Sequence, residues 1–295
     1  MEKIELLQNS TMASNRIVWL NGEILSEDEA RISPFDLGFS VGDGCFESLV
    51  TYDRMPFAFS RHHARLMASA EAMGMNVDSI PSKEELFQAV RTVIERNKLA
   101  DPMCIRIAVT SGLSLLGLLR CGAPCTVMVA AVPGGRQGDT CSVMTSSYMR
   151  NDKSPFKGIK TLSYIENMMI LAEAVGKGMG EALLANTSGQ ICSGTISNVF
   201  WVQDGVVKTC PLEGGAFPGV TRGLVMELCR SLGIACVEAY EPFSSLQSLE
   251  EVFLTSSLCE VQPVAMIDGR RLFPGATTMR LRKAFADLVD DSLDP

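Results

Sequence analysis

A lysine and three hydroxyl-rich segments have the residue types of a site that forms imines and binds a phosphate group. Lys160 lies close to Leu162 and Tyr164, so its sequence neighbours are less polar than those of a typical surface lysine. A lysine removed from water has a lowered pKa and becomes a nucleophile toward carbonyl carbons. The ordinary alternative is a solvated surface lysine. The hydroxyl-rich segments are residues 193–198, 217–222 and 255–260.

Two of these segments have the features of a phosphate cradle. Pro218 and Gly219 suit the start of a helix, where free N–H groups bind anions. Residues 255–257 carry three hydroxyls directly after an apolar strand, so these groups are expected at the strand end. Each motif alone is also typical of an ordinary cap or turn. Together with Lys160 they predict a pyridoxal 5′-phosphate site, which needs an amine for the Schiff base and a cradle for the phosphate.

The composition narrows the class of protein. With 295 residues and 46% apolar residues, the chain is long enough and apolar enough for two domains with large cores. A net charge of −8 disfavours a nucleic acid partner. No apolar run is long enough to span a membrane, and the first residues lack the basic start of a signal peptide. We therefore expect a cytoplasmic protein that binds a small molecule.

The cysteines and histidines do not form a metal-binding pattern. The ten cysteines are scattered and include no C-x-x-C pair, and the chain has two histidines. A zinc framework is not expected, and the cysteines are predicted to be reduced thiols, mostly buried.

The expected elements mix strands and helices without regular alternation, which predicts an α+β fold. Asn21-Gly22 predicts the turn of a hairpin over residues 17–24, and Ser82 with Glu85 predicts the capped start of a helix. A loop is expected to begin at Ser33. Further strands are expected at residues 45–52, 105–110, 126–132, 182–186, 198–202, 206–209, 252–255 and 263–267. Helices are expected at residues 61–75, 83–97, 163–177, 219–232 and from 277.

A cluster of glycines after Pro133 marks the expected domain boundary. It divides the chain into an N-terminal α+β domain (1–133), a linker (134–139) and a C-terminal domain (140–295). The three hydroxyl-rich segments and Lys160 all fall in the C-terminal domain, which is therefore predicted to bind the cofactor.

Along nearly its whole length, the chain resembles the class IV aminotransferases, also called fold-type IV pyridoxal phosphate enzymes. The resemblance runs from residues 32–39, through residues 42–47 and the segments above, to residues 263–269. This family includes branched-chain and D-amino acid aminotransferases and aminodeoxychorismate lyase. The resemblance implies a smaller N-terminal and a larger C-terminal domain, and a homodimer with its sites near the subunit interface.

The resemblance also implies roles for individual residues. Lys160 matches the Schiff-base lysine, and Arg65 matches the phosphate-binding arginine. Tyr164 matches the residue that hydrogen-bonds the cofactor's phenolic oxygen, and Phe217 matches a side chain that packs against the pyridine ring. Without the resemblance, Arg65 would be predicted to be a charge on a helix surface, and Tyr164 is also compatible with core packing. The rest of the phosphate cup is implied to be Val220, Thr221, Ser256, Ser257 and Leu258.

Two departures from the family pattern bear on the reaction. The family usually has glutamate where this chain has Ser193; that carboxylate keeps the pyridine nitrogen protonated, whereas a serine carries no charge. D-amino acid aminotransferases have an arginine where this chain has Ser111, so that carboxylate site is missing.

Arg106 alternates with Ala108 on an expected strand and is predicted to face a substrate carboxylate, with an ordinary ion pair as the alternative. Phe39 and Phe46 are predicted to shape the substrate pocket, although core packing explains them equally well.

Three functions follow from these features. The first is transfer of an amino group between an amino acid and a 2-oxo acid. The second is the elimination of pyruvate from aminodeoxychorismate, an amino-cyclohexadiene. Ser193 favours this reaction, and residues 33–36 and 196–201 resemble the corresponding segments of bacterial aminodeoxychorismate lyases. The third is an inactive protein that binds pyridoxal phosphate, because Ser193 replaces the glutamate.

Overall fold

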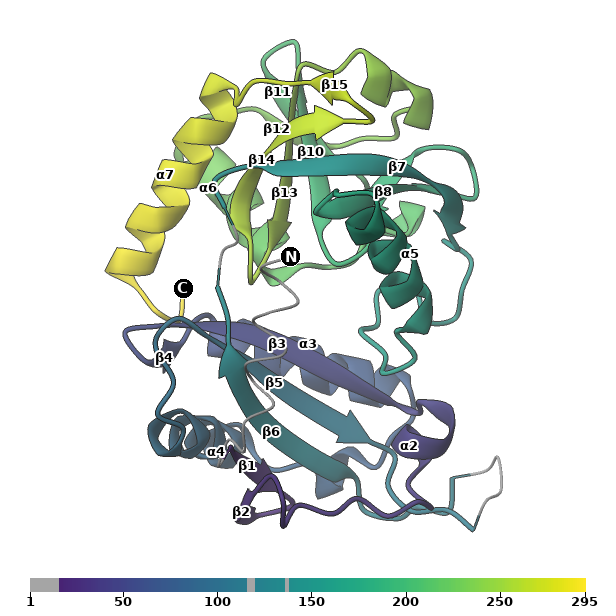
Figure 1. Cartoon of the computed structure of the whole chain (residues 1–295), viewed down its shortest axis with the longest axis vertical. Helices are drawn as coiled ribbons and strands as arrows, with labels where there is room; N and C mark the ends of the chain where they lie inside the picture. The colour runs from purple at the N-terminus through teal and green to yellow at the C-terminus, as the bar shows by residue number, and fades with distance from the viewer. Residues whose placement is uncertain (1–15, 116–119, 136–137) are drawn as a thin grey trace.

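The computed structural model of the chain describes residues 16–115, 120–135 and 138–295. Two sheets, each with its own helices, lie one above the other (Figure 1). The prediction that the chain lacks a signal peptide concerns its first residues, which lie outside the described residues. Arg136 and Gln137 of the predicted linker also lie outside them.

The first sheet has the strand order β2-β1-β6-β5-β3-β4, and all its neighbouring strands are antiparallel. Its predicted hairpin is confirmed, with Asn21 and Gly22 at the positive φ values that a tight turn needs. The strands are β1 (Ile17–Leu20), β2 (Glu23–Ser26), β3 (Gly44–Tyr52), β4 (Met55–Pro56), β5 (Met103–Thr110) and β6 (Thr126–Pro133).

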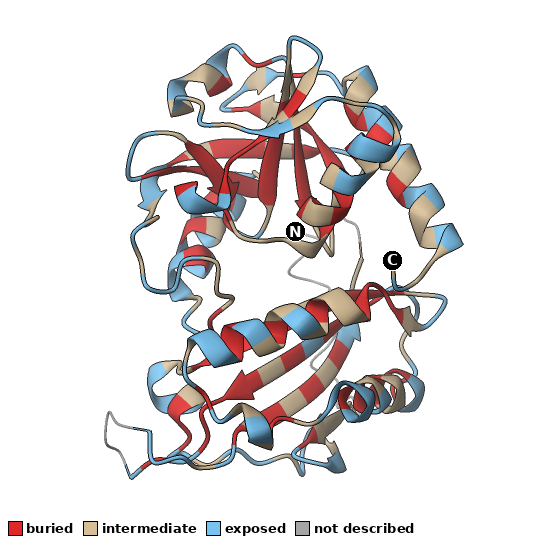
Figure 2. Cartoon of the chain, turned by 180° about the vertical axis from the view of Figure 1, so that it is seen from behind, coloured by how far each residue is buried: buried red, intermediate tan, exposed pale blue. Residues whose placement is uncertain are grey.

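Two helices, α3 (Phe59–Ala72) and α4 (Lys83–Arg96), cover one face of this sheet. Buried side chains such as Leu66, Val90 and Ile105 fill the space between the layers, and Figure 2 shows the buried residues concentrated on the strands. The predicted capping box of α4 is confirmed, because Ser82 Oγ accepts a hydrogen bond from Glu85 N and the Glu85 carboxylate accepts one from Ser82 N. Two short helices complete this part of the chain: α2 (Leu37–Val41) and η1 (Val77–Ser79).

The second sheet is mixed and has the strand order β12-β11-β10-β13-β14-β7-β8-β9, with β15 paired to β14. Its strands are β7 (Cys141–Arg150), β8 (Glu181–Asn186), β9 (Ile191–Gly194), β10 (Asn198–Gln203), β11 (Val206–Thr209), β12 (Cys236–Glu238), β13 (Glu251–Ser256), β14 (Glu260–Ile267) and β15 (Arg270–Arg271). Its helices are α5 (Ile165–Gly176), α6 (Val220–Ser231), α7 (Ala276–Asp291), η2 (Leu212–Gly214) and η3 (Phe243–Gln247).

Two of the differences from the expected elements have clear physical reasons. The sequence analysis missed β7, in which serines and threonines interrupt the apolar residues, because parallel pairing to β8 and β14 rather than local pattern forms this strand. The expected loop after Ser33 contains the short helix α2, whose N-cap Asp36 accepts hydrogen bonds from Gly38 N and from the Thr110 and Thr126 hydroxyls.

The α+β class is confirmed, because each of the two layers combines a sheet with helices. The first sheet ends with Pro133 and the second begins with Cys141, and we keep the division at residues 134–139 as a proposal. No helix in the described ranges is long and apolar enough to cross a membrane. The same residues contain no cluster of three or more His, Cys, Asp or Glu side chains that would hold a metal ion.

Among the described residues, backbone hydrogen bonds join the two layers at two places. The loop that carries Lys160 lies along the free edge of β3, where Phe46 N donates to Lys160 O and Leu162 N donates to Gly44 O. At the other end of β3, Ala58 N donates to Leu293 O beyond α7. Because both connections are made of backbone hydrogen bonds, they fix the space between the sheets, where the predicted site residues lie.

Candidate active site

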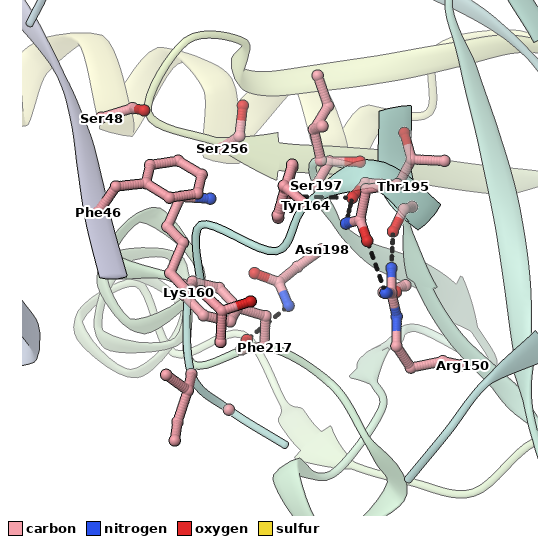
Figure 3. A pocket seen from close by; sticks show the side chains of 18 of the residues that line it. Phe46, Ser48, Arg150, Lys160, Tyr164, Thr195, Ser197, Asn198, Phe217 and Ser256 are labelled. Atoms are coloured by element: carbon pink, nitrogen blue, oxygen red, sulfur yellow. Dashed lines mark hydrogen bonds between the residues drawn. The ribbon is translucent and has the colours of Figure 1, made fainter. Parts of the chain in front are cut away.

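A cavity of about 590 Å³ lies between the two sheets and brings most of the predicted site residues together (Figure 3). Its walls come from β3 and β5 of the first sheet, the Lys160 loop, the β9–β10 turn, the start of α6 and the end of β13. The predicted residues that line it are Phe46, Arg65, Arg106, Lys160, Tyr164, Ser193, Phe217, Val220, Thr221, Ser256, Ser257 and Leu258.

Lys160 projects into this cavity between aromatic rings. Its Nζ lies 4.6 Å from the ring centroid of Phe46, 5.1 Å from that of Tyr164 and 5.2 Å from that of Phe217. Burial lowers the pKa of Lys160 to about 8, and the positive charge of Arg65 contributes to this shift. At pH 7 roughly a tenth of this lysine is therefore an uncharged amine, which is far more than for an ordinary lysine and is the form that imine formation requires.

The lowered pKa predicts how fast the chain takes up an aldehyde ligand. Only the uncharged amine attacks an aldehyde, so the rate of covalent attachment of pyridoxal phosphate to the cofactor-free chain should rise roughly tenfold per pH unit below about pH 8. Above that pH the rate should level off. Stopped-flow absorbance measures this directly. A rate that kept rising toward the pKa of an ordinary lysine would contradict the assignment.

The start of α6 provides unpaired N–H groups next to the cavity. Its N-cap is Gly219, which has no side chain to cap the helix, and Val220 and Thr221 form its first turn. Asn198 holds the preceding turn, because its Nδ2 donates to Phe217 O at 2.8 Å. A Cβ atom at Gly219 would lie 2.2 Å from Asn198 Oδ1, so only glycine fits there. The N-terminus of α6 thus faces the cavity and can bind an anion.

Arg65 is fixed beside this helix start by a buried carboxylate. Its Nε donates to Glu47 Oε1 at 2.8 Å and its Nη2 to Glu47 Oε2 at 2.5 Å, while Nη1 donates to Pro218 O at 2.9 Å. These three bonds leave two of the five guanidinium N–H groups for a ligand. The guanidinium also lies 4.6 Å from the Phe217 ring centroid. Arg65 is therefore held in place as a cation of the cavity and is not a free surface charge.

Ser193 lies buried on β9 at the wall of the cavity, and among the described residues its Oγ has no hydrogen-bond partner. Arg150 lies close by: its Nη1 donates to Asn167 Oδ1 at 3.0 Å and its Nη2 to Gly194 O at 3.4 Å. Both of these acceptors are neutral. This part of the cavity therefore combines an unsatisfied hydroxyl with a positive charge.

A buried carboxylate that the sequence analysis missed organises the neighbouring turn. Glu181 accepts hydrogen bonds from Thr195 N at 2.9 Å, Ile196 N at 3.2 Å and Ser197 Oγ at 2.8 Å, and from the Thr195 hydroxyl. Because these donors belong to consecutive residues, Glu181 sets the conformation of the turn that follows Ser193. The only sequence signal was a single glutamate at the start of the apolar strand β8.

Replacing Glu181 with alanine should strongly destabilise the chain. The change leaves several buried donors without an acceptor, so we expect the free energy of unfolding to fall by about 2–4 kcal/mol in urea titrations. Glu181→Gln should cost less, because its amide oxygen still accepts. Glu173→Ala removes an exposed ion pair with Lys177 and is the control, expected to change stability by about 0.5 kcal/mol or less. Equal effects of the two alanine variants would show that Glu181 does not organise this turn.

Two of the three residues predicted to contact the substrate line the cavity, and the third does not. Arg106 and Phe46 line the cavity together, with the guanidinium 4.1 Å from the ring centroid, and Ser48 lies directly opposite Arg106 in the sheet. Phe39 lies on α2, is 75% exposed and does not line this cavity. The structure of the single chain therefore brings Arg106 and Phe46 to the site and leaves Phe39 outside it.

Comparison with known proteins places this fold and cavity in a family. The family model described as amino-transferase class IV matches residues 44–267. A Methanocaldococcus jannaschii protein, provisionally named a branched-chain-amino-acid aminotransferase, is 33% identical over 92% of this chain and 96% of its own length. The structure of the branched-chain aminotransferase of Thermoproteus uzoniensis with norvaline has a TM-score of 0.87 at 28% identity, covering 94% of this chain and 95% of that one. A hypothetical aminotransferase from Mycobacterium tuberculosis in its PLP-bound form has a TM-score of 0.82 at 25% identity, covering 94% and 100%.

The chain belongs to the class IV aminotransferases. It is a transaminase that depends on pyridoxal phosphate. The residues present fit this cofactor: Lys160 supplies an amine of lowered pKa, the uncapped start of α6 and Arg65 supply anion donors, and Ser193 supplies an unsatisfied buried hydroxyl.

Proposed function

We propose that this chain transfers the amino group of aliphatic amino acids to a 2-oxo acid, with Lys160 as the catalytic residue. The observation that carries the proposal is the position of Lys160, whose amine has a lowered pKa and lies among three aromatic rings in the cavity. When bound, pyridoxal phosphate supplies an aldehyde for the amino group and a ring that delocalises negative charge.

In this proposal each part of the cavity has its own task. Lys160 would hold the cofactor covalently and, once a substrate amine displaces it, would take the proton from the substrate's Cα and pass it to the carbon that had been the cofactor's aldehyde carbon. Arg65, the first turn of α6 and residues 256–258 bind the phosphate. Tyr164 would donate a hydrogen bond to the phenolic oxygen and Ser193 one to the pyridine nitrogen, and Phe217 would pack against the ring.

For a substrate, the cavity offers apolar side chains and the cation Arg106. Phe156, Met168, Leu171 and Ile196 line the cavity, and three of these side chains are exposed at its opening. Such a wall suits an aliphatic side chain. The relative from Thermoproteus uzoniensis is named a branched-chain aminotransferase, and the one from Methanocaldococcus jannaschii is provisionally named one. Arg106 supplies a positive charge for a substrate carboxylate.

Replacing Arg106 with methionine should weaken carboxylate binding without changing the size of the pocket much. Loss of a charge-assisted hydrogen bond predicts a fall of about 10- to 100-fold in kcat/KM. A fall confined to dicarboxylic substrates would assign Arg106 to their side-chain carboxylate, and a fall for all substrates would assign it to the α-carboxylate. Arg96→Met, at an exposed position on α4, is the control. Unchanged kinetics for both substrate classes would contradict the role.

A second candidate is the elimination of pyruvate from aminodeoxychorismate. Ser193 favours it, because a hydroxyl leaves the pyridine nitrogen with no negative partner and makes the ring a weaker acceptor of electrons. Elimination discharges the substrate's negative charge at once and therefore needs this acceptor for a shorter time than transamination does.

Single-turnover absorbance separates these functions. The cofactor-loaded chain is mixed with L- and D-forms of aliphatic and acidic amino acids. Conversion of the cofactor to its amine form with release of a 2-oxo acid supports the proposal and identifies the preferred enantiomer of the substrate. Absence of conversion, together with pyruvate release from aminodeoxychorismate, would support the lyase. Absence of both would support an inactive protein that binds the cofactor.

We also propose that the chain forms a homodimer in the cytoplasm. Apolar side chains are exposed on and near α2, including Phe39 (75% exposed) and Leu115 (96% exposed), and a second copy would cover them. Sedimentation velocity at several concentrations tests the assembly, and a monomer at all of them would contradict it.

A further inference from the structure

One buried histidine connects the carboxylate behind Arg65 to the hydroxyl at the end of β13. His62 lies on the inner face of α3 with 2% of its side chain exposed. Its Nδ1 lies 2.7 Å from Glu47 Oε2, and its Nε2 lies 3.3 Å from Ser257 Oγ. Ser257 lines the cavity, so Glu47, His62 and Ser257 form a chain of hydrogen bonds that ends at the proposed phosphate cradle.

Glu47 determines which nitrogen of His62 carries a proton. Burial alone would raise the pKa of Glu47, but the charge and hydrogen bonds of Arg65, with the hydrogen bond of His62, lower it to about 2. The carboxylate is therefore ionised and accepts a hydrogen bond from His62 Nδ1–H. Nε2 then has a lone pair that points toward Ser257.

The cofactor-free chain favours the neutral form of His62. Burial lowers the pKa of His62; Glu47 opposes this shift, and the positive charges of Arg65 and Lys160 add to it. These three groups and Ser257 are the titratable or hydrogen-bonding side chains of the described residues that act on the ring, from β3, α3, the Lys160 loop and the end of β13. In this state the Ser257 hydroxyl donates to Nε2 and presents only lone pairs to the cavity.

A phosphate dianion would reverse this arrangement, because its oxygens accept hydrogen bonds and repel lone pairs. We propose that His62 takes up a proton when the cofactor's phosphate binds, so that Nε2–H donates to Ser257 and the Ser257 hydroxyl donates to the phosphate. His62 is then a positioning residue, since it reaches the phosphate through Ser257. Two negative charges enter the cradle, and one proton accompanies them into the site. The proposal depends on the cofactor's phosphate and is independent of the reaction catalysed.

The chain has only two histidines, which allows a direct test. Histidine-selective ¹⁵N labelling gives two imidazole signals, and His63 serves as an internal control, because no hydrogen bond joins it to Glu47 or Ser257 among the described residues. The probe is pyridoxine 5′-phosphate, which has no aldehyde and leaves Lys160 unmodified. At neutral pH we expect one protonated nitrogen on His62 without the probe and two with it. The same protonation state with and without the probe would overturn the proposal.

Variants of Ser257 show whether the phosphate acts on His62 through the Ser257 hydrogen bond, which we call the relay, or through its charge alone. In Ser257→Ala, saturated with the probe, His62 should stay neutral, whereas Ser257→Thr should behave like the wild type. A fully protonated His62 in Ser257→Ala would mean that the phosphate acts through space and would overturn the relay. Pyridoxine without phosphate should leave His62 neutral in every variant.

Affinity provides a second readout. If ligand binding raises the pKa of a group, the proton that the group takes up increases the affinity for the ligand. This increase is complete below the pKa of the free protein and disappears as the pH rises through the pKa of the complex. The dissociation constant of His62→Gln for pyridoxine 5′-phosphate should therefore exceed that of the wild type most at low pH. The ratio should be roughly tenfold for each unit by which phosphate raises the pKa of His62. His63→Gln should follow the wild type, and a ratio for His62→Gln that does not change with pH would contradict the proposal.

Discussion

Replacing Lys160 with alanine should lower the rate of the amino-transfer half-reaction by at least about 10⁴-fold. In the proposed mechanism the variant loses the amine that holds the cofactor and the base that takes the proton from the substrate's Cα, and general base catalysis alone contributes about 10²–10⁴-fold. Single-turnover absorbance with the substrate preferred by the wild type measures the loss. A small primary amine added to the solution should restore part of the rate, because it can enter the cavity and remove the same proton.

Two observations keep this result distinct from unfolding or loss of cofactor. The substitution leaves the proposed phosphate cradle unchanged, so we expect Lys160→Ala still to bind pyridoxal phosphate, now removable by dialysis. Lys153→Ala changes an exposed lysine of the preceding loop that does not line the cavity, and should stay within about twofold of the wild type. A Lys160→Ala variant that retains more than about one-hundredth of the rate would remove this lysine from the mechanism.

The elements of the fold with strong local signals were predictable from the sequence. The Asn21-Gly22 turn and the Ser82 capping box specify their structures through backbone conformation and short-range hydrogen bonds, and both are confirmed. Strands such as β7 were not predictable, because their hydrogen-bond partners lie far away in the sequence. Local pattern does not report parallel pairing of this kind.

The site was predictable where a residue type itself carries the chemistry. Lys160 and the hydroxyls near residues 220 and 256 could be selected from the sequence because an amine and a phosphate cradle have recognisable residues. Arg65 needed the resemblance to a family, since a single arginine on an amphipathic helix is usually a surface charge. The structure adds that Glu47 and Pro218 hold its guanidinium against the cavity.

The supporting residues could not be predicted, because each acts through tertiary contacts. Glu181, Arg150 and His62 are a glutamate at a strand start, an arginine at a strand end and a histidine on a helix. Only the fold shows that Glu181 organises the turn after Ser193, that Arg150 contacts this turn, and that His62 reaches Ser257. These polar groups support the residues of the proposed site through tertiary contacts, and their sequence signals are correspondingly weak.

Replacing Ser193 with glutamate should increase the rate of transamination by about tenfold or more. A carboxylate within about 4–6 Å of a basic nitrogen raises its pKa by about 1–3 units, so the pyridine nitrogen would be protonated in a larger fraction of the molecules. In the wild type, the hydroxyl of Ser193 provides no negative charge for that nitrogen. The protonated ring accepts the negative charge that develops at the substrate's Cα more readily.

Ser193→Gln is the matched control, because glutamine has the size of glutamate and lacks its charge. The protonation of the pyridine nitrogen can be observed independently of the rate by ¹⁵N NMR of a cofactor labelled at that position. We expect a protonated nitrogen in Ser193→Glu and an unprotonated one in the wild type and in Ser193→Gln. A glutamate variant no faster than the glutamine variant would show that ring protonation does not limit transamination in this chain.

The same variant tests why this chain has a serine at position 193. If Ser193 keeps the ring a weak acceptor of electrons, the glutamate variant should gain transamination and lose elimination, because a longer-lived negative charge at Cα has more time to receive a proton on the cofactor. The ratio of 2-oxo acid formed by transamination to pyruvate formed by elimination, measured with one substrate that can undergo both reactions, reports this partition. A rise in the ratio would mean that Ser193 tunes this site toward elimination. A constant ratio would assign the choice of reaction to the substrate pocket around Arg106 and Phe46.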